Sequence, residues 1–104
     1  MRELPGPIMF DWNLGNLNKN FARHGVNNLE AEEVFTNVPV LILPDGKHLG
    51  IEERKLLLGV TNSGRGLAII FTVRGNKIRI ISARDMNKKE RRFYGETIKE
   101  NTTI

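Results

Sequence analysis

The side chains best suited to chemistry in this chain are guanidinium groups, one imidazole and one carboxylate. Arg79 and Arg84 stand on and at the end of a predicted strand, and a guanidinium fork matches two phosphate oxygens. His24 is the only histidine on a predicted element, and an imidazole can transfer protons near neutral pH. With Glu53 as a second candidate base, these groups suit metal-independent RNA cleavage. They could deprotonate a 2′-hydroxyl, stabilise charge on the phosphate and protonate the leaving oxygen.

Each of these candidate catalytic residues also has a structural interpretation. Strict alternation along a strand puts Arg79 and Arg84 on opposite faces, so either Arg84 has left the strand or only one arginine faces the site. Either arginine could pair with Glu53 or Glu90, and Glu53 could form an edge-strand salt bridge. His24 ends a predicted helix, where the helix dipole alone favours a cation.

Positive charge is concentrated between Arg74 and Tyr94. This segment carries +6 in a chain whose net charge is +4. A localised basic field of this kind usually faces a polyanion such as RNA, although a solvated charged face is the alternative. Tyr94 could stack on a base or pack in the core. The predicted RNA-binding residues are Arg54, Arg74, Lys88, Lys89, Arg91, Arg92 and Tyr94.

Length and composition indicate a single domain over residues 1–104, with an irregular lead-in at 1–7 and a flexible polar tail at 96–104. The chain has no cysteine, so disulfides and thiolate metal sites are excluded. No apolar stretch has the length of a signal peptide or a membrane span, so we expect a soluble, cytoplasmic protein. His24 and His48 have no matched partners, and we expect neither metal nor cofactor.

Two helices are predicted near the N-terminus, after a short strand at 8–12. Apolar spacing favours a first helix over 13–24, capped by Asn13, with Leu14, Leu17 and Phe21 on its buried face. A second helix over 28–36 begins with a capping pair, Asn27 and Glu30. It should bury Ala31, Val34 and Phe35 and expose its three glutamates.

The remaining chain predicts strands and one more helix. Strands are expected from Val38, with a turn at 44–46, and over 54–61, 67–74 and 77–84; the last two are joined by the tight connection Gly75-Asn76. Both faces of 67–74 are apolar, which predicts a central strand. A helix follows, capped by Asn87 and Glu90. The predicted fold is α+β, with a small antiparallel sheet, two N-terminal helices and one C-terminal helix in the order β-α-α-β-β-β-β-α.

Several motifs follow one another over about residues 8–95. They are FDWN at 10–13, N-x-x-x-HGV from 20, E-x-x-x-VF from 30, Glu53-Arg54, RG-x-x-IRIISAR ending at Arg84, and E-x-x-x-Y at 90–94. In these motifs the chain resembles the BrnT family of bacterial toxins. The resemblance implies a RelE-like fold, a ribonuclease that arrests growth, and a cognate BrnA-type antitoxin that supplies DNA binding to the complex.

The resemblance also maps family positions onto this chain. Matched positions are His24, Glu53, Arg54, Arg79, Arg84, Glu90 and Tyr94. Two positions depart from the family, which usually has aspartate where this chain has Asn13 and commonly lysine where it has Asn16. If that lysine binds phosphate, activity here would be weaker.

The leading hypothesis is a metal-independent endoribonuclease toxin of a type II toxin-antitoxin system. Arg79 and Arg84 would hold the scissile phosphate, His24 or Glu53 would transfer the proton, and the helix over 88–92 would follow the RNA backbone. The alternative is a non-catalytic module that uses the same basic surface to bind RNA or an antitoxin.

Overall fold

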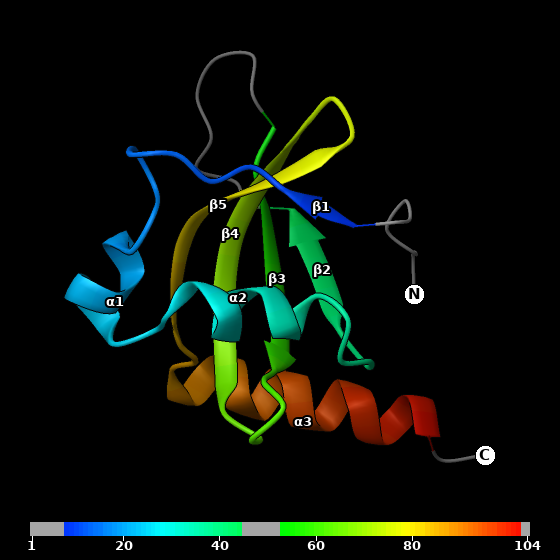
Figure 1. Cartoon of the computed structure of the whole chain (residues 1–104). Coiled ribbons are helices and arrows are strands. Elements are labelled where there is room, and N and C mark those ends of the chain that lie inside the picture. Colours follow the sequence, from blue (N-terminus) through cyan, green and yellow to red (C-terminus); the bar gives the residue numbers. More distant parts are fainter. Residues whose placement is uncertain (1–7, 45–52, 103–104) are drawn as a thin grey trace.

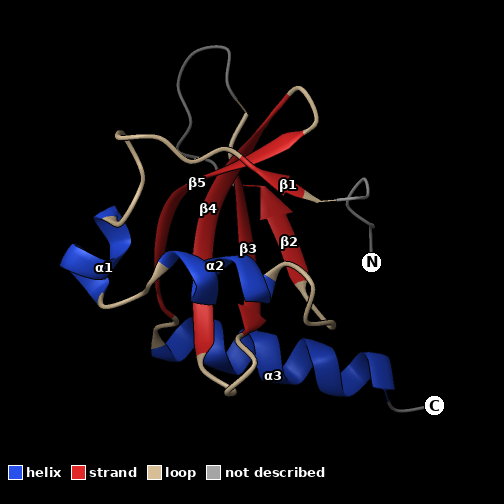
Figure 2. Cartoon of the chain, viewed as in Figure 1, coloured by secondary structure: helices blue, strands red, loops and turns tan. Residues whose placement is uncertain are grey.

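The computed structural model describes residues 8–44 and 53–102 and shows an α+β fold in which helices cover both faces of one sheet (Figures 1 and 2). The element order matches the prediction. The elements are β1 (Met9–Phe10), α1 (Lys19–His24), α2 (Asn28–Val34), β2 (Leu41–Pro44), β3 (Lys55–Val60), β4 (Gly66–Arg74), β5 (Lys77–Asp85) and α3 (Lys88–Thr102). Most of the turn predicted at 44–46, and His48, lie outside the described residues.

The sheet has five strands in the order β1-β5-β4-β3-β2. The run from β2 to β5 is antiparallel, as predicted, and β4 is central. The prediction of a purely antiparallel sheet is wrong at one edge, because β1 pairs with β5 in parallel. No hairpin links β1 to β5, so turn geometry does not impose an antiparallel direction on this pair.

Each face of the sheet has its own apolar layer. On one face α2 packs with Phe35 between Phe10 and Phe71, at ring-centroid distances of 5.3 and 5.1 Å. On the other face, α3 crosses the sheet and covers a cluster that includes Leu58 and Met86. Figure 1 shows α2 in front of the strands and α3 behind them.

The helix α2 follows its sequence signals closely. The Asn27 side chain accepts a hydrogen bond from the Glu30 amide, and the Glu30 carboxylate accepts one from the Asn27 amide, which forms the predicted capping box. Ala31, Val34 and Phe35 are buried as expected. The three glutamates are only partly exposed, because each binds another segment: Glu30 binds Arg65, Glu32 binds Trp12 and Glu33 binds the Asn62 amide.

The helix α1 is shorter than predicted and faces the opposite way. It begins at Lys19 rather than Asn13, because Asn18 adopts the left-handed conformation with φ of 60°. Its inward side is polar: Asn16 and Asn20 are only 3% and 4% exposed. The side chains predicted to be buried, Leu14, Leu17 and Phe21, are exposed instead.

The two asparagines face inward because they bind backbone groups of β5 that β1 does not reach. The strand β1 pairs with only two residues of β5. Asn16 donates to the carbonyl oxygens of Asp11 and Ile80 at 3.0 and 3.1 Å. One turn later, Asn20 accepts from the Ala83 amide at 3.0 Å. Side-chain amides therefore replace a strand along this edge of the sheet.

The helix α3 is longer than predicted. Its expected end was near Gly95, with 96–104 as a tail, but the helix continues to Thr102. Tyr94, Thr97 and Ile98 are half-buried at helical spacing, so the packed side of the helix extends past the glycine. A single glycine inside a helix costs only about 1 kcal/mol.

Candidate active site and nucleic-acid interface

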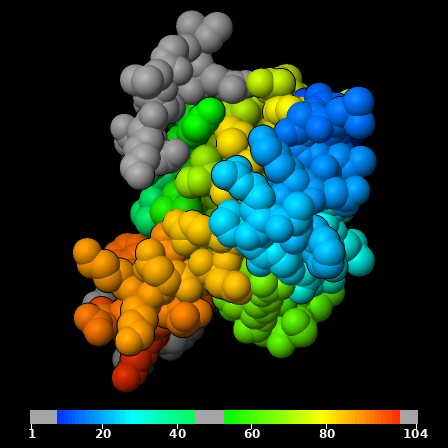
Figure 3. Space-filling model, turned by 90° about the vertical axis from the view of Figure 1, so that its left-hand side faces the viewer, coloured from blue at the N-terminus to red at the C-terminus, as the bar shows by residue number. Residues whose placement is uncertain are grey.

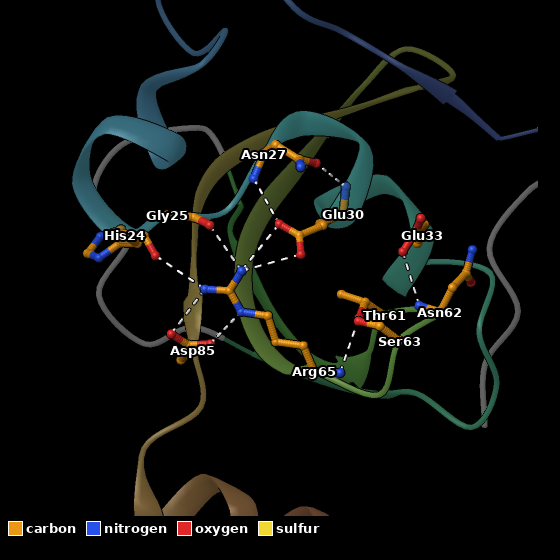
Figure 4. Close-up of polar contacts among 10 residues, drawn as sticks. All are labelled: His24, Gly25, Asn27, Glu30, Glu33, Thr61, Asn62, Ser63, Arg65 and Asp85. Atoms are coloured by element: carbon orange, nitrogen blue, oxygen red, sulfur yellow. Dashed lines mark hydrogen bonds and ion pairs between the residues drawn. The ribbon is translucent and has the colours of Figure 1, made fainter.

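Arg65, in the loop between β3 and β4, joins three distant segments (Figure 4). Its guanidinium donates to both carboxylate oxygens of Asp85 at 2.7 and 3.2 Å, and to Glu30 at 3.2 Å. It also donates to the carbonyl oxygens of Gly25 and His24 at 3.0 and 3.3 Å. We call this group of contacts the Arg65 clamp. It holds the end of α1, the start of α2 and the end of β5 together.

The clamp places Asp85 in a strongly cationic field. Hydrogen bonding to Arg65 lowers the pKa of Asp85 and outweighs the opposing effect of burial, and the charges of Arg65, Arg91 and His24 act in the lowering direction. The same hydrogen bond raises the pKa of Arg65. Residues from α1 and α3 therefore act electrostatically on one carboxylate at the end of β5.

His24 is the last residue of α1, and its side chain is exposed. Its carbonyl oxygen is fixed by Arg65, while its ring points away from the guanidinium (Figure 4). Among the described residues the imidazole makes no hydrogen bond to another side chain. The backbone turns sharply after it, because Gly25 has φ of 68°. The structure thus fixes the main chain of His24 and leaves the imidazole available to a ligand.

The start of α3, which is rich in basic residues, lies on the same side of the molecule as α1 (Figure 3). Lys88, Lys89, Arg91 and Arg92 are all exposed on the first turns of the helix. Figure 3 shows the end of β5 and the start of α3 adjoining α1 on one side of the molecule. The helix start is set by the predicted capping box, in which Asn87 and Glu90 exchange hydrogen bonds of 2.8 and 2.9 Å. We call this surface, made by Arg23, His24, Lys88, Lys89, Arg91 and Arg92, the α1–α3 face.

Arg84 lies next to the α1–α3 face, but its guanidinium is occupied. It donates to both carboxylate oxygens of Glu90 at 2.8 and 2.9 Å. Hydrogen bonding to Arg84 lowers the pKa of Glu90, and the bond to the Asn87 amide acts in the same direction. The alternative in which Arg84 pairs with Glu90 is therefore confirmed, and the arginine anchors α3 to β5.

Arg79 lies farther along β5 and on the same face of the sheet as Arg84, contrary to strict alternation. Ile70 pairs with Ser82 and Phe71 with Ile80, so Ile81 is an extra residue that shifts the alternation. The two arginines stand about 13 Å apart along the strand. Arg79 donates to Asn13 at 3.1 Å and lies 3.7 Å from Asp11. This geometry does not form the shared phosphate grip that the sequence predicts.

The other predicted residues lie at the opposite end of the sheet. Glu53 is exposed and lies 3.9 Å from Lys55, as in the salt-bridge alternative. Arg54 follows it and immediately precedes β3, and Arg74 ends β4 at the hairpin. Glu53, Arg54, Arg74 and Arg79 therefore form a second group, remote from His24.

Tyr94 is packed against other side chains and is not freely exposed to solvent. It packs against the cluster of Leu58, Ala68 and Met86, and its hydroxyl donates to the Pro39 carbonyl at 2.6 Å. Burial raises its pKa. These contacts match the core interpretation of Tyr94 more closely than base stacking.

Sequence reasoning missed the Arg65 clamp. The only signal was the loop motif TNSGRG, which lacks the helix that a phosphate-binding loop requires. Asn16, one of the two departures from the family pattern, is buried, and its side chain donates to the Asp11 and Ile80 carbonyl oxygens.

Two further observations concern metal ions and membranes. Within residues 8–44 and 53–102, no three His, Cys, Asp or Glu side chains gather in a way that could hold a metal ion. In the same residues, no helix has both the length and the hydropathy needed to span a membrane.

Comparison with known proteins identifies the family. The family model described as the ribonuclease toxin BrnT of a type II toxin-antitoxin system matches residues 12–90. Comparison with curated proteins gives no match. The family match begins at Trp12 and ends at Glu90, so it includes α1, the Arg65 clamp and the Arg84–Glu90 pair. Since the matched region covers well over half of the 104 residues, this chain belongs to the BrnT family of ribonuclease toxins.

Proposed function

We propose that this protein is a metal-independent endoribonuclease toxin of the cytosol, with a RelE-like fold, and that a cognate antitoxin neutralises it. His24 transfers the proton in this proposal. The carrying observation is the α1–α3 face, which combines an exposed imidazole on a fixed main chain with four exposed cations of α3, on the side of the molecule where the start of α3 adjoins α1 (Figure 3).

The reaction follows from these groups. The 2′-oxygen of the RNA loses its proton, bonds to phosphorus and displaces the 5′-oxygen, which takes up a proton. The products are a 2′,3′-cyclic phosphate and a 5′-hydroxyl, so no metal or other co-reactant is consumed. His24 exchanges the protons, and the cations of α3 stabilise charge on the phosphate oxygens.

Glu53 is a weaker candidate for the base because of its location. It lies at the far end of the sheet with Arg54, Arg74 and Arg79. This second group supports a role in binding RNA beyond the cleaved bond. An RNA strand that follows β5 would pass from one group to the other over about 13 Å.

The test is RNA cleavage by purified protein in excess EDTA. We compare the wild type with His24→Gln, and use His48→Gln as the matched control for loss of a histidine. We expect cleavage to fall about 100-fold or more in His24→Gln, the usual size of a proton-transfer contribution, and to persist in the control. Full activity of His24→Gln would contradict the role of His24, and activity that requires an added metal would contradict metal independence.

A non-catalytic RNA-binding module is the second candidate, and one observation favours it. Arg84 donates both terminal nitrogens to Glu90, and Arg79 donates one to Asn13, so both guanidinium groups already have protein partners. This candidate predicts salt-dependent RNA binding by the wild type with no cleavage product under any condition.

A further inference from the structure

The α1 segment exposes the residues that an amphipathic helix normally buries. Leu14, Leu17 and Phe21 are 98%, 43% and 60% exposed. Leu14 and Leu17 lie in the turns that lead into α1, and Phe21 lies in α1 itself, so the three exposed apolar side chains belong to one short segment of the chain. We call these three residues the apolar stripe.

The stripe is a consequence of how α1 is attached. Asn16 and Asn20 hold the inner side of the segment against β5, and Arg65 fixes its end at His24 and Gly25. Rotating the segment to bury the leucines would break these buried hydrogen bonds, each of which costs about 1–3 kcal/mol to leave unmade. Intramolecular packing therefore cannot cover the stripe.

The apolar surface extends toward the start of α2. Asn28 donates to Asn18 at 2.9 Å and accepts from the Asn18 amide at 3.2 Å, which brings this helix start beside α1. The next residue, Leu29, is 65% exposed. Grouped exposed apolar residues of this kind mark interaction sites more often than isolated ones do.

The charges around the apolar stripe determine which kind of partner would be attracted to it. Lys19 and Arg23 are exposed on α1 itself, and the cations of α3 adjoin it on the same side of the molecule. Two acidic groups held at the end of α1 by the Arg65 clamp, Glu30 and Asp85, are already bound by Arg65. A second copy of this chain would bring like charges together, whereas an acidic partner would be attracted.

We propose that the apolar stripe is the docking site for an acidic amphipathic helix of the antitoxin. The partner helix would place apolar side chains, spaced by three or four residues, on Leu14, Leu17 and Phe21, and acidic side chains near Lys19 and Arg23. The identity of the partner as an antitoxin rests on the proposed function. Bound there, the helix would adjoin His24 and hinder RNA from reaching it.

The experiment measures binding and cleavage separately. The partner is the protein encoded by the neighbouring gene, and affinity is measured by calorimetry. The test variant is Leu17→Ser with Phe21→Ser; the matched control is Val38→Ser, which removes an apolar side chain that is 73% exposed in the connection between α2 and β2. We expect the test variant to bind about 100-fold more weakly, because apolar anchors dominate such interfaces, and the control to bind almost as tightly as the wild type.

Charge is tested in the same assay. The variant Lys19→Glu with Arg23→Glu should bind more weakly at low salt, and its deficit should shrink at high salt. Unchanged melting temperatures would show that the exposed substitutions leave the fold intact.

The outcomes separate this inference from the proposed function. Wild-type affinity in Leu17→Ser with Phe21→Ser would overturn the inference, as would failure of the neighbouring gene's product to bind the wild type. A wild-type dimer that this variant dissociates would assign the stripe to a second copy instead. Absence of RNA cleavage by the wild type would overturn the proposed function alone, because the binding difference would remain.

Discussion

At the residue scale, the arginines differ in what already binds their guanidinium groups. Arg65 and Arg84 each bind a carboxylate through two nitrogens, and Arg79 lies between Asp11 and Asn13. Arg91 is exposed on α3. The guanidinium groups of the β5 arginines therefore already have protein partners, whereas the cations on the first turns of α3 are exposed.

The first prediction concerns the Arg84–Glu90 pair. Glu90→Gln keeps the shape of the side chain but removes the charge that Arg84 binds. We expect the free energy of unfolding to fall by about 1–3 kcal/mol, as for other hydrogen bonds to charged groups. Urea unfolding measures the decrease. Glu96→Gln, at an exposed position of α3, is the control and should change little.

The second prediction concerns the stability of the fold at acidic pH. The pKa values of Asp85 and Glu90 lie below their ordinary values of 3.8 and 4.5 in the folded protein. Both carboxylates therefore stabilise the fold fully above about pH 4.5, and this contribution is lost as pH falls through the lowered pKa values. Unfolding curves between pH 7 and pH 3 should show the decline. Asp85→Asn with Glu90→Gln should flatten it, and an equally steep decline in that variant would contradict the assignment.

Single residues also show where sequence reasoning stops. Both capping boxes could be predicted, because their members are three residues apart. The Arg65 clamp could not, because its partners stand between 20 and 41 residues away. Local spacing carries no information about such contacts.

At the element scale, α1 shows what periodicity can and cannot decide. Leu14, Leu17 and Phe21 predicted an amphipathic helix, and part of that helix exists. Periodicity did not reveal which side faces inward, since that depends on the unpaired edge of β5. The parallel pairing of β1 has the same origin, because partners distant in sequence set its direction.

The third prediction tests how α1 is attached. Asn20→Ala would leave the Ala83 amide without its acceptor in a buried position. We expect the unfolding free energy to fall by about 1–3 kcal/mol, measured by thermal or urea unfolding. Asn28→Ala removes an exposed asparagine pair and should cost less. Equal decreases in the two variants would contradict a special contribution of Asn20.

The fourth prediction tests the packing of α2 on β3. A methyl group at position 59 would lie 2.7 Å from Val34 Cγ1 and 3.2 Å from Val40 Cγ1. Gly59→Ala should therefore destabilise the protein by about 1–3 kcal/mol through overpacking. Gly95→Ala, where nothing lies within 4 Å, should be neutral or stabilising. A melting temperature unchanged in Gly59→Ala would show that α2 can shift to make room.

At the scale of the whole molecule, the basic groups occupy two ends of one sheet. The α1–α3 face lies at one end, and Arg54, Arg74 and Arg79 lie at the other. The fold class, the element order and the basic character of the segment 74–94 were predictable, because they follow from patterning and composition. The division of the basic residues into two groups was not, because it depends on the sheet.

The fifth prediction separates the two ends by salt dependence. Lys88→Ala with Lys89→Ala should weaken RNA binding and reduce the slope of log affinity against log salt by about 0.7 for each phosphate that these lysines neutralise. Lys77→Ala, at the start of β5 and paired with Arg74, measures the contribution of the hairpin end, which we expect to be smaller. Filter-binding titrations at several salt concentrations measure both. A larger effect at Lys77 would assign RNA to the hairpin end.

The bulge at Ile81 determines where β5 could lose a residue and keep its side chains on the same faces of the sheet. One additional residue reverses which layer each later side chain enters, so Ala83 points to the buried layer and Arg84 to α3. A chain lacking this residue would pair regularly here and keep Ala83 and Arg84 on their present layers, whereas regular pairing with the residue retained would direct the guanidinium into the apolar layer. Relatives should therefore tolerate loss of one residue at this point of β5 more readily than loss of one residue elsewhere in the strand.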